Sequence, residues 1–146
     1  MGISAFMDRS YRIGPDGHGV VCDTVVGGQD IVALSDALAW RRDELSRVEL
    51  DVDAVLTLRG LMVLDDMLVA ANAFEQAAPL TVNREQVHVL CEIAGAYVAA
   101  RDVAGYQAPE ERDRIKRLRV LGGPLMDCCS ELAAAEDEVR ERAISV

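Results

Sequence analysis

The sequence is poor in basic residues, in aromatic residues and in long apolar runs. Its 146 residues include 15 Lys and Arg against 25 Asp and Glu, a formal net charge of -10, and only one Trp, three Tyr and two Phe. Affinity for nucleic acid comes from an excess of Lys and Arg, so we expect no nucleic-acid partner. No uncharged run approaches the roughly 20 apolar residues of a membrane span, so we expect no membrane association.

Cysteine and histidine are too few and too scattered for the common metal and redox motifs. The four cysteines, Cys22, Cys91, Cys128 and Cys129, form no C-x-x-C pair, and no basic, apolar leader precedes Asp8. A chain of this length can bury a sizeable core without disulfides, so we expect reduced thiols and a cytoplasmic protein.

The sequence also lacks a complete metal or catalytic motif. Glu85 and His88 form one E-x-x-H, the spacing that di-iron bundles use, but such sites need two of these motifs and two further carboxylates. There is no G-x-S-x-G segment, and no cysteine has a histidine placed by sequence to activate it. We therefore predict no catalytic residue, no metal and no other cofactor, which leaves enzymatic activity undecided but disfavoured.

The sequence is rich in apolar residues, which make up 51% of the chain. We predict one domain over residues 1–146. Residues 1–29 should form a β-hairpin or extended segment, because the β-branched run Val20–Val26 follows the turn-forming Gly14–Gly19. Residues 30–146 should form a helical bundle, so the expected fold class is mainly α, a four- to five-helix bundle with a short N-terminal β-hairpin.

Five helices are expected from capping residues and apolar spacing. Asp30 is the predicted N-cap of the first, and Asn83 with Gln86 forms a capping box for the third. Gly122-Gly123-Pro124 should break the chain between the last two. The expected ranges are 30 to about 48, 52–78, 81 or 83 to about 105, 109 to about 121, and 124 to about 142.

Three charged residues fall on faces that the apolar pattern assigns to the interior. Arg59 and Asp66 lie within about 20° of each other on the apolar side of the second helix, and Arg101 lies beside Tyr97 on the apolar side of the third. A buried charge must be paired. One interpretation is a structural ion pair, either Asp66 with Arg101 or one across a subunit interface. The other is a polar pocket inside the bundle, lined by Arg59, Asp66, Arg101 and Tyr97, that binds an anionic or polar ligand through the two arginines.

Acidic residues are concentrated in the first two helices. Residues 30–78 contain ten Asp and Glu and four Arg, so they hold -6 of the net charge. Five of these acids crowd around the junction between the helices: Asp43, Glu44, Glu49, Asp51 and Asp53. Such a surface can steer a basic protein partner, although acidic excess also serves solubility alone.

The one dense basic cluster lies in the fourth helix, between residues 112 and 119. Acidic residues are interleaved with it and no aromatic residue accompanies it, so nucleic-acid binding is again disfavoured. We expect a solvated face or charge pairs with the acidic second helix.

Together these patterns predict a small acidic helical protein-interaction module, an accessory, inhibitor or immunity-type factor that forms a homodimer. The alternative is a ligand-binding or enzymatic bundle with a pocket around Arg59, Asp66 and Arg101.

Overall fold

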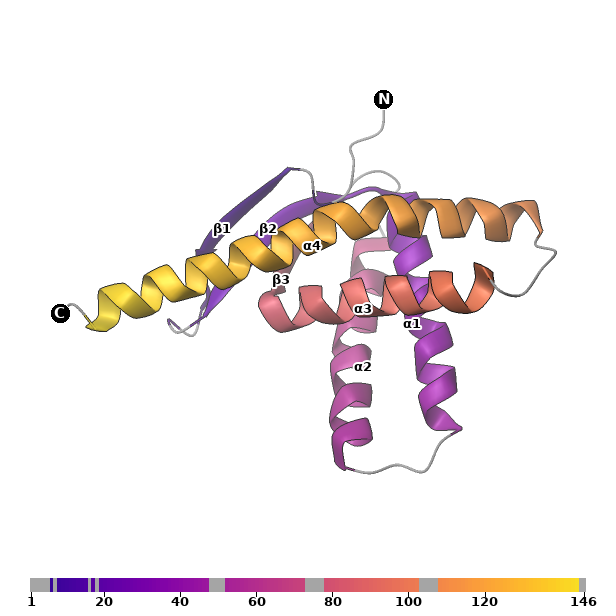
Figure 1. Cartoon of the computed structure of the whole chain (residues 1–146), viewed down its shortest axis with the longest axis horizontal. Coiled ribbons are helices and arrows are strands. Elements are labelled where there is room, and N and C mark those ends of the chain that lie inside the picture. The colour runs from indigo at the N-terminus through magenta and orange to yellow at the C-terminus, as the bar shows by residue number, and fades with distance from the viewer. Residues whose placement is uncertain are drawn as a thin grey trace.

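The computed structural model describes residues 6, 8–15, 17, 19–47, 52–72, 78–102 and 108–144, without the side chains of residues 52–58, 71, 72, 78, 102, 143 and 144. The described residues are mainly helical, with four helices and a three-stranded antiparallel sheet (Figure 1). In chain order the elements are β1 (Arg9–Ile13), β2 (Val20–Val26), α1 (Gly28–Ser46), α2 (Val52–Asn72), β3 (Ala78–Asn83), α3 (Arg84–Asp102) and α4 (Pro109–Ile144).

The predicted N-terminal hairpin is confirmed. β1 pairs with β2 in antiparallel register, with Ile13 opposite Val20, and the Gly14 amide donates to the Gly19 carbonyl at 2.7 Å to close the loop. Burial alternates strictly along β2, as a strand with one covered face requires. Its inward residues are Val20, Cys22, Thr24 and Val26.

The third strand was not predicted. We expected residues 78–82 to hold the end of the second helix and the start of the third, but α2 ends at Asn72 and Ala78–Asn83 pairs with β2. Leu80 and Val82 are buried while Pro79 and Thr81 are exposed, which is the two-residue period of a strand. β3 is an edge strand in the order β1-β2-β3, so the missing amide hydrogen of Pro79 is tolerated.

The predicted helix starts at Asn83 and Pro109 are confirmed, and the one at Asp30 is wrong. The Asn83 side chain accepts from the Gln86 amide at 2.8 Å, and the Gln86 side chain accepts from the Asn83 amide at 2.9 Å, so the capping box of α3 is formed. α4 begins at Pro109 as expected. Asp30 is not the N-cap of α1, because Gly27 occupies that position and Asp30 lies in the first turn.

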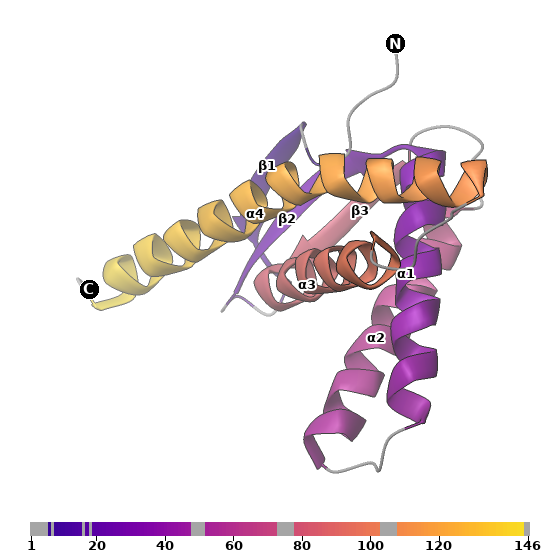
Figure 2. The same ribbon diagram turned by 45° about the vertical axis from the view of Figure 1, so that its right-hand side comes forward.

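The predicted break at Gly122-Gly123-Pro124 is wrong. α4 is a single helix of 36 residues that contains Pro124, and it bends near its middle (Figures 1 and 2). A proline removes one backbone hydrogen bond and kinks a helix without necessarily ending it. Buried residues on both sides of the glycines, Leu118, Leu121, Leu125 and Cys128, keep the two halves packed on the same core.

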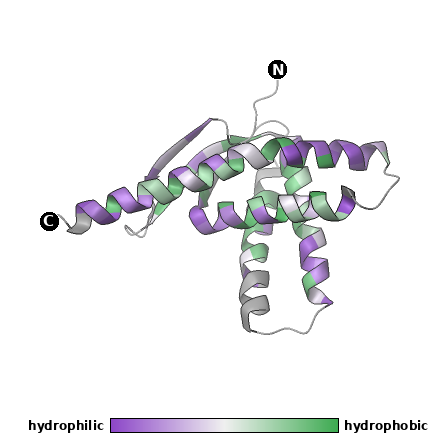
Figure 3. Ribbon diagram, in the orientation of Figure 1, coloured by the Kyte–Doolittle hydropathy of each residue, from purple (hydrophilic) through white to green (hydrophobic). Residues whose placement is uncertain are grey.

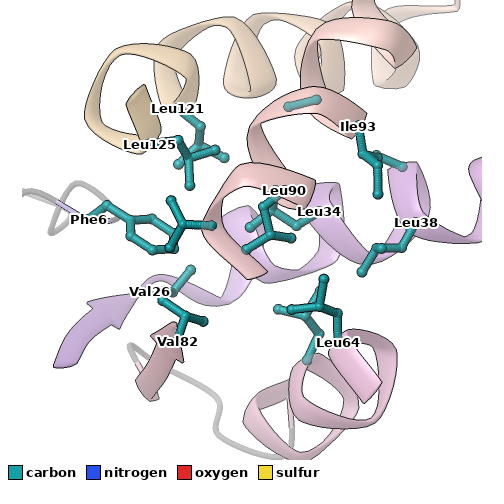
Figure 4. Packing of buried hydrophobic residues seen from close by; sticks show 14 of the residues in the cluster. Phe6, Val26, Leu34, Leu38, Leu64, Val82, Leu90, Ile93, Leu121 and Leu125 are labelled. Carbon is teal, nitrogen blue, oxygen red and sulfur yellow. The ribbon is translucent and has the colours of Figure 1, made fainter. Parts of the chain in front are cut away.

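Side chains from all the strands and helices converge on one core. β2 and β3 contribute Val26 and Val82, and the helices contribute Leu34, Leu90 and Leu125, all almost fully buried (Figure 4). Phe6 packs into the same cluster although it precedes the first strand. The core therefore lies between the sheet and the four helices.

α1 and α2 form a helical hairpin that projects from this body (Figure 2). Leu61, Leu64 and Leu68 form the buried side of α2, and an ion pair between Arg42 and Asp65, at 2.9 Å, links the two helices. The hairpin therefore presents its remaining surface to solvent, with the opposite side of α2 facing away from α1.

Candidate functional site

The structure places Arg59 and Asp66 on the solvent side of α2, so the prediction that they are buried in the bundle is wrong. Both side chains are exposed, and neither makes a hydrogen bond or ion pair within the part of the chain that the structure describes. The apolar pattern did not identify the buried side of α2, because this helix is apolar over most of its circumference. The buried side consists of Leu61, Leu64 and Leu68. The solvent side is apolar as well.

We call this surface the outward face of α2. Met62 and Val63 are each 52% exposed and Val69 is 61% exposed, and charged Arg59 and Asp66 lie among them. Figure 3 shows apolar colouring along the described part of α2. The outward face consists of Arg59, Met62, Val63, Asp66, Val69 and Ala70, all of which are exposed.

Tyr97 and Arg101, the other two predicted ligand residues, belong to a polar cluster elsewhere. Tyr97 is almost fully buried, and its hydroxyl donates to Glu111 Oε1 at 2.8 Å and accepts from Arg114 Nη1 at 3.2 Å. The Arg101 guanidinium carbon lies 5.4 Å from the centre of the Tyr97 ring, and its Nε is 3.6 Å from Glu111. The structure thus joins two of the four predicted residues, and Arg59 and Asp66 are not part of this group.

The polar cluster ties three helices together. Arg114 pairs with Asp36 of α1 at 3.0 Å and with Glu111 at 2.6 Å, while Trp40 of α1 packs edge-on against the Tyr97 ring. Burial raises the pKa of the Tyr97 hydroxyl above its ordinary value. Within the described residues each charge in this cluster has an opposite charge nearby, and we call the group the interhelical clamp.

The sequence pattern did not identify the other members of the cluster around Tyr97, which are Asp36, Glu111 and Arg114. Each of these residues occupies a polar position that is typical of the solvent-facing side of a helix. Only the packing of α1 and α4 around α3 brings them to Tyr97. The basic cluster of α4 pairs in the same way, with Arg117 3.7 Å from Asp30. Arg114 and Arg117 thus pair with α1 and not with the second helix, whereas Arg112, Lys116 and Arg119 are exposed, as the alternative of a solvated face predicts.

The predicted acidic surface lies at the far end of the helical hairpin. Asp43 and Glu44 are exposed, but each is paired within α1, Asp43 with Arg47 at 2.7 Å and Glu44 with Arg41 at 3.2 Å. Glu49 and Asp51 lie outside the described residues, as does the side chain of Asp53. The described part of this surface is thus partly neutralised by its own arginines.

A second polar group links the sheet to α4. Arg9 donates to Glu131 through Nε at 2.6 Å and through Nη2 at 3.0 Å, and the Tyr11 hydroxyl also donates to Glu131. The Arg9 guanidinium lowers the pKa of Glu131 to about 2, although half of that carboxylate faces solvent. Beneath this group lie two fully buried free thiols. Interaction with Cys128 raises the pKa of the Cys22 thiol, and interaction with Cys22 lowers the pKa of the Cys128 thiol.

The described residues offer no preformed metal centre. No three His, Cys, Asp or Glu side chains within the described ranges come together as a metal would require, and His88 lies 3.9 Å from Glu92 on an exposed face. A solvent-open hollow of about 470 Å³ lies between the β1–β2 loop, the start of α3 and Glu136, and none of the predicted ligand residues lines it. None of the helices, over the residues described, is long and apolar enough to cross a membrane.

Comparisons of the chain with family models, with curated proteins and with solved structures return no match.

Proposed function

We propose that this protein is a small acidic helical protein-interaction module, an accessory, inhibitor or immunity-type factor that acts as a homodimer. The observation that supports the proposal is the outward face of α2, where Met62, Val63 and Val69 are each more than half exposed. Isolated exposed apolar residues are common on any protein, whereas a group of them on one helix face marks a contact surface.

The position of this face favours a protein partner over a small ligand. Small ligands bind in concave pockets that enclose most of their surface. The outward face of α2 lies instead on a projecting helical hairpin, where it is accessible to another macromolecule (Figures 1 and 2). The alternative, a pocket around Arg59, Asp66 and Arg101, gains no support from this arrangement, because Arg101 and Tyr97 belong to the interhelical clamp.

The acidic end of the same hairpin is the proposed contact for a basic protein partner. Asp43 and Glu44 remain solvent-exposed beyond their pairs with Arg47 and Arg41. Exposed charges of one sign raise association rates with oppositely charged partners more than they raise affinity. In this proposal the apolar face joins two copies, and the acidic ends of the two hairpins are displayed for the partner.

The expected dimer is of moderate strength. A standard stable interface buries about 800 Å² on each partner, and one face of the 21-residue α2 offers less than that. We therefore expect dissociation in the micromolar range, which light scattering can follow across a dilution series.

Replacement of Val63 by lysine tests the proposal. A lysine there would place an unpaired charge in the apolar contact, so the Val63→Lys variant should dissociate at least about tenfold more readily than the unchanged protein. Size-exclusion chromatography with light scattering at matched concentrations measures the change. The control is Val120→Lys, since Val120 is 65% exposed on α4 and lies outside the proposed interface. If both lysine variants dimerise like the unchanged protein, the outward face of α2 is not the interface.

A further inference from the structure

The charges on the outward face of α2 have a pattern that a second copy of the same helix would satisfy. Arg59 and Asp66 are seven residues apart, which is about 10 Å along the helix and about 20° around it. Met62 and Val63 lie midway between the two charges, and both are half exposed. The face therefore has an apolar centre, a positive charge toward one end and a negative charge toward the other.

Neither of these two charges is paired within the described part of the chain. In the described residues Arg59 and Asp66 are exposed and form no hydrogen bond or ion pair, whereas their neighbour Asp65 pairs with Arg42. Intramolecular pairing thus accounts for the acid on the inner side of α2 but not for the two charges on its outward face. A charged pair within an apolar face is suited to fixing the orientation and register of a contact.

The signs of the two charges distinguish between the possible arrangements of two helices. A two-fold axis parallel to the helices would bring each residue against its own copy, so Arg59 would face Arg59 of the partner subunit. A two-fold axis perpendicular to α2, passing between residues 62 and 63, reverses the second helix. It then places Arg59 level with Asp66 of the partner subunit, and Asp66 level with Arg59 of the partner subunit. Only the second arrangement pairs opposite charges, and it does so twice.

We infer that α2 packs antiparallel against α2 of a second copy of this chain, with Met62 and Val63 at the two-fold axis and an Arg59–Asp66 pair on either side. This inference rests on the homodimer of the proposed function and adds the orientation and register of the contact. The projecting hairpin leaves the outward face accessible for such packing (Figure 2).

Charge reversal tests the register. Arg59→Asp and Asp66→Arg each replace two attractive pairs by two repulsive ones, so each variant alone should dimerise at least about tenfold more weakly than the unchanged protein. An equimolar mixture of the two single variants should recover dimers, because each pair across the interface is again opposite in sign. The double variant Arg59→Asp/Asp66→Arg should dimerise like the unchanged protein. Sedimentation velocity at low ionic strength measures all four.

Matched reversals on another exposed surface control for the change in net charge. Arg112→Asp and Asp127→Arg alter two exposed α4 residues that lie outside the proposed interface, and they should leave the dissociation constant within about threefold. Circular dichroism verifies the helical content of every variant. Failure of the mixture and of the double variant to recover dimers would overturn the antiparallel register.

The outcomes also separate this inference from the proposed function. If the charge variants all dimerise normally while Val63→Lys does not, the interface stands and the register is wrong. If the unchanged protein is a monomer at every concentration, the homodimer and the register are both wrong.

Discussion

At the scale of single residues, the best-defined polar contact joins Glu131 of α4 to Arg9 and Tyr11 of β1. Arg9 is only 14% exposed and forms two hydrogen bonds to the carboxylate, so this contact fixes the edge strand on the long helix. Glu131 itself is 45% exposed, and solvent screening reduces what the pair contributes to stability.

The Glu131→Gln variant should be less stable than the unchanged protein by about 1 kcal/mol at neutral pH. Arg9 lowers the folded-state pKa of Glu131 to about 2, below its ordinary value of 4.5. The stabilisation is therefore complete above pH 4.5 and is lost as the pH falls toward 2. Urea unfolding of both proteins across this range should show the difference between them shrinking with acidity.

Glu138→Gln provides the control for this contact, because Glu138 pairs with Arg142 within α4 and both are exposed. Its effect should be smaller than that of Glu131→Gln. Equal effects of the two substitutions at neutral pH would mean that the contact between β1 and α4 contributes nothing of its own.

At the scale of secondary-structure elements, two glycines near the centre of α4 lower the free energy of unfolding. Gly122 and Gly123 lie within the helix, and a Cβ atom added at either position would meet nothing within 4 Å. Alanine in place of both should raise the free energy of unfolding by about 1 to 2 kcal/mol, because glycine loses more backbone freedom on folding. Thermal unfolding followed by circular dichroism measures the gain.

Gly17 supplies the opposite case within the same chain. Its φ of +77° is in the left-handed region, so Gly17→Ala should lower stability although the added methyl group has space.

For α4, a loss of stability in the Gly122→Ala/Gly123→Ala variant would contradict the expected gain and would show that the bend of the helix depends on the glycines.

Local signals predicted those elements whose boundaries are set by neighbouring residues. The loop between β1 and β2, the Asn83–Gln86 capping box and the Pro109 start all depend on contacts within six residues, and all are present. β3 and the continuity of α4 depend on partners distant in the sequence. Residues 78–83 become a strand by pairing with β2, and α4 continues past Pro124 because the core holds both of its halves.

The same limit applies to the candidate site. The sequence showed that Arg59 and Asp66 share one direction on α2, and this holds for any helix. It did not show which side of an almost wholly apolar helix would pack against α1. The location of Asp36, Glu111 and Arg114 around Tyr97 likewise depends on how three helices meet.

At the scale of the whole molecule, the body and the helical hairpin present different kinds of surface. The body places β2, α3 and α4 around one core, and its ion pairs connect elements to one another. The helical hairpin instead presents an apolar face on α2, whose two charges have no partner among the described residues, and an acidic end on α1. The central claim is that this face is the contact between two copies of the chain.

Sedimentation equilibrium of the unchanged protein tests that claim most directly, over concentrations from low to high micromolar. If α2 joins two copies of the chain, the mass rises from the 15.8 kDa of one chain to twice that value as the concentration increases. A mass of 15.8 kDa at every concentration would contradict it.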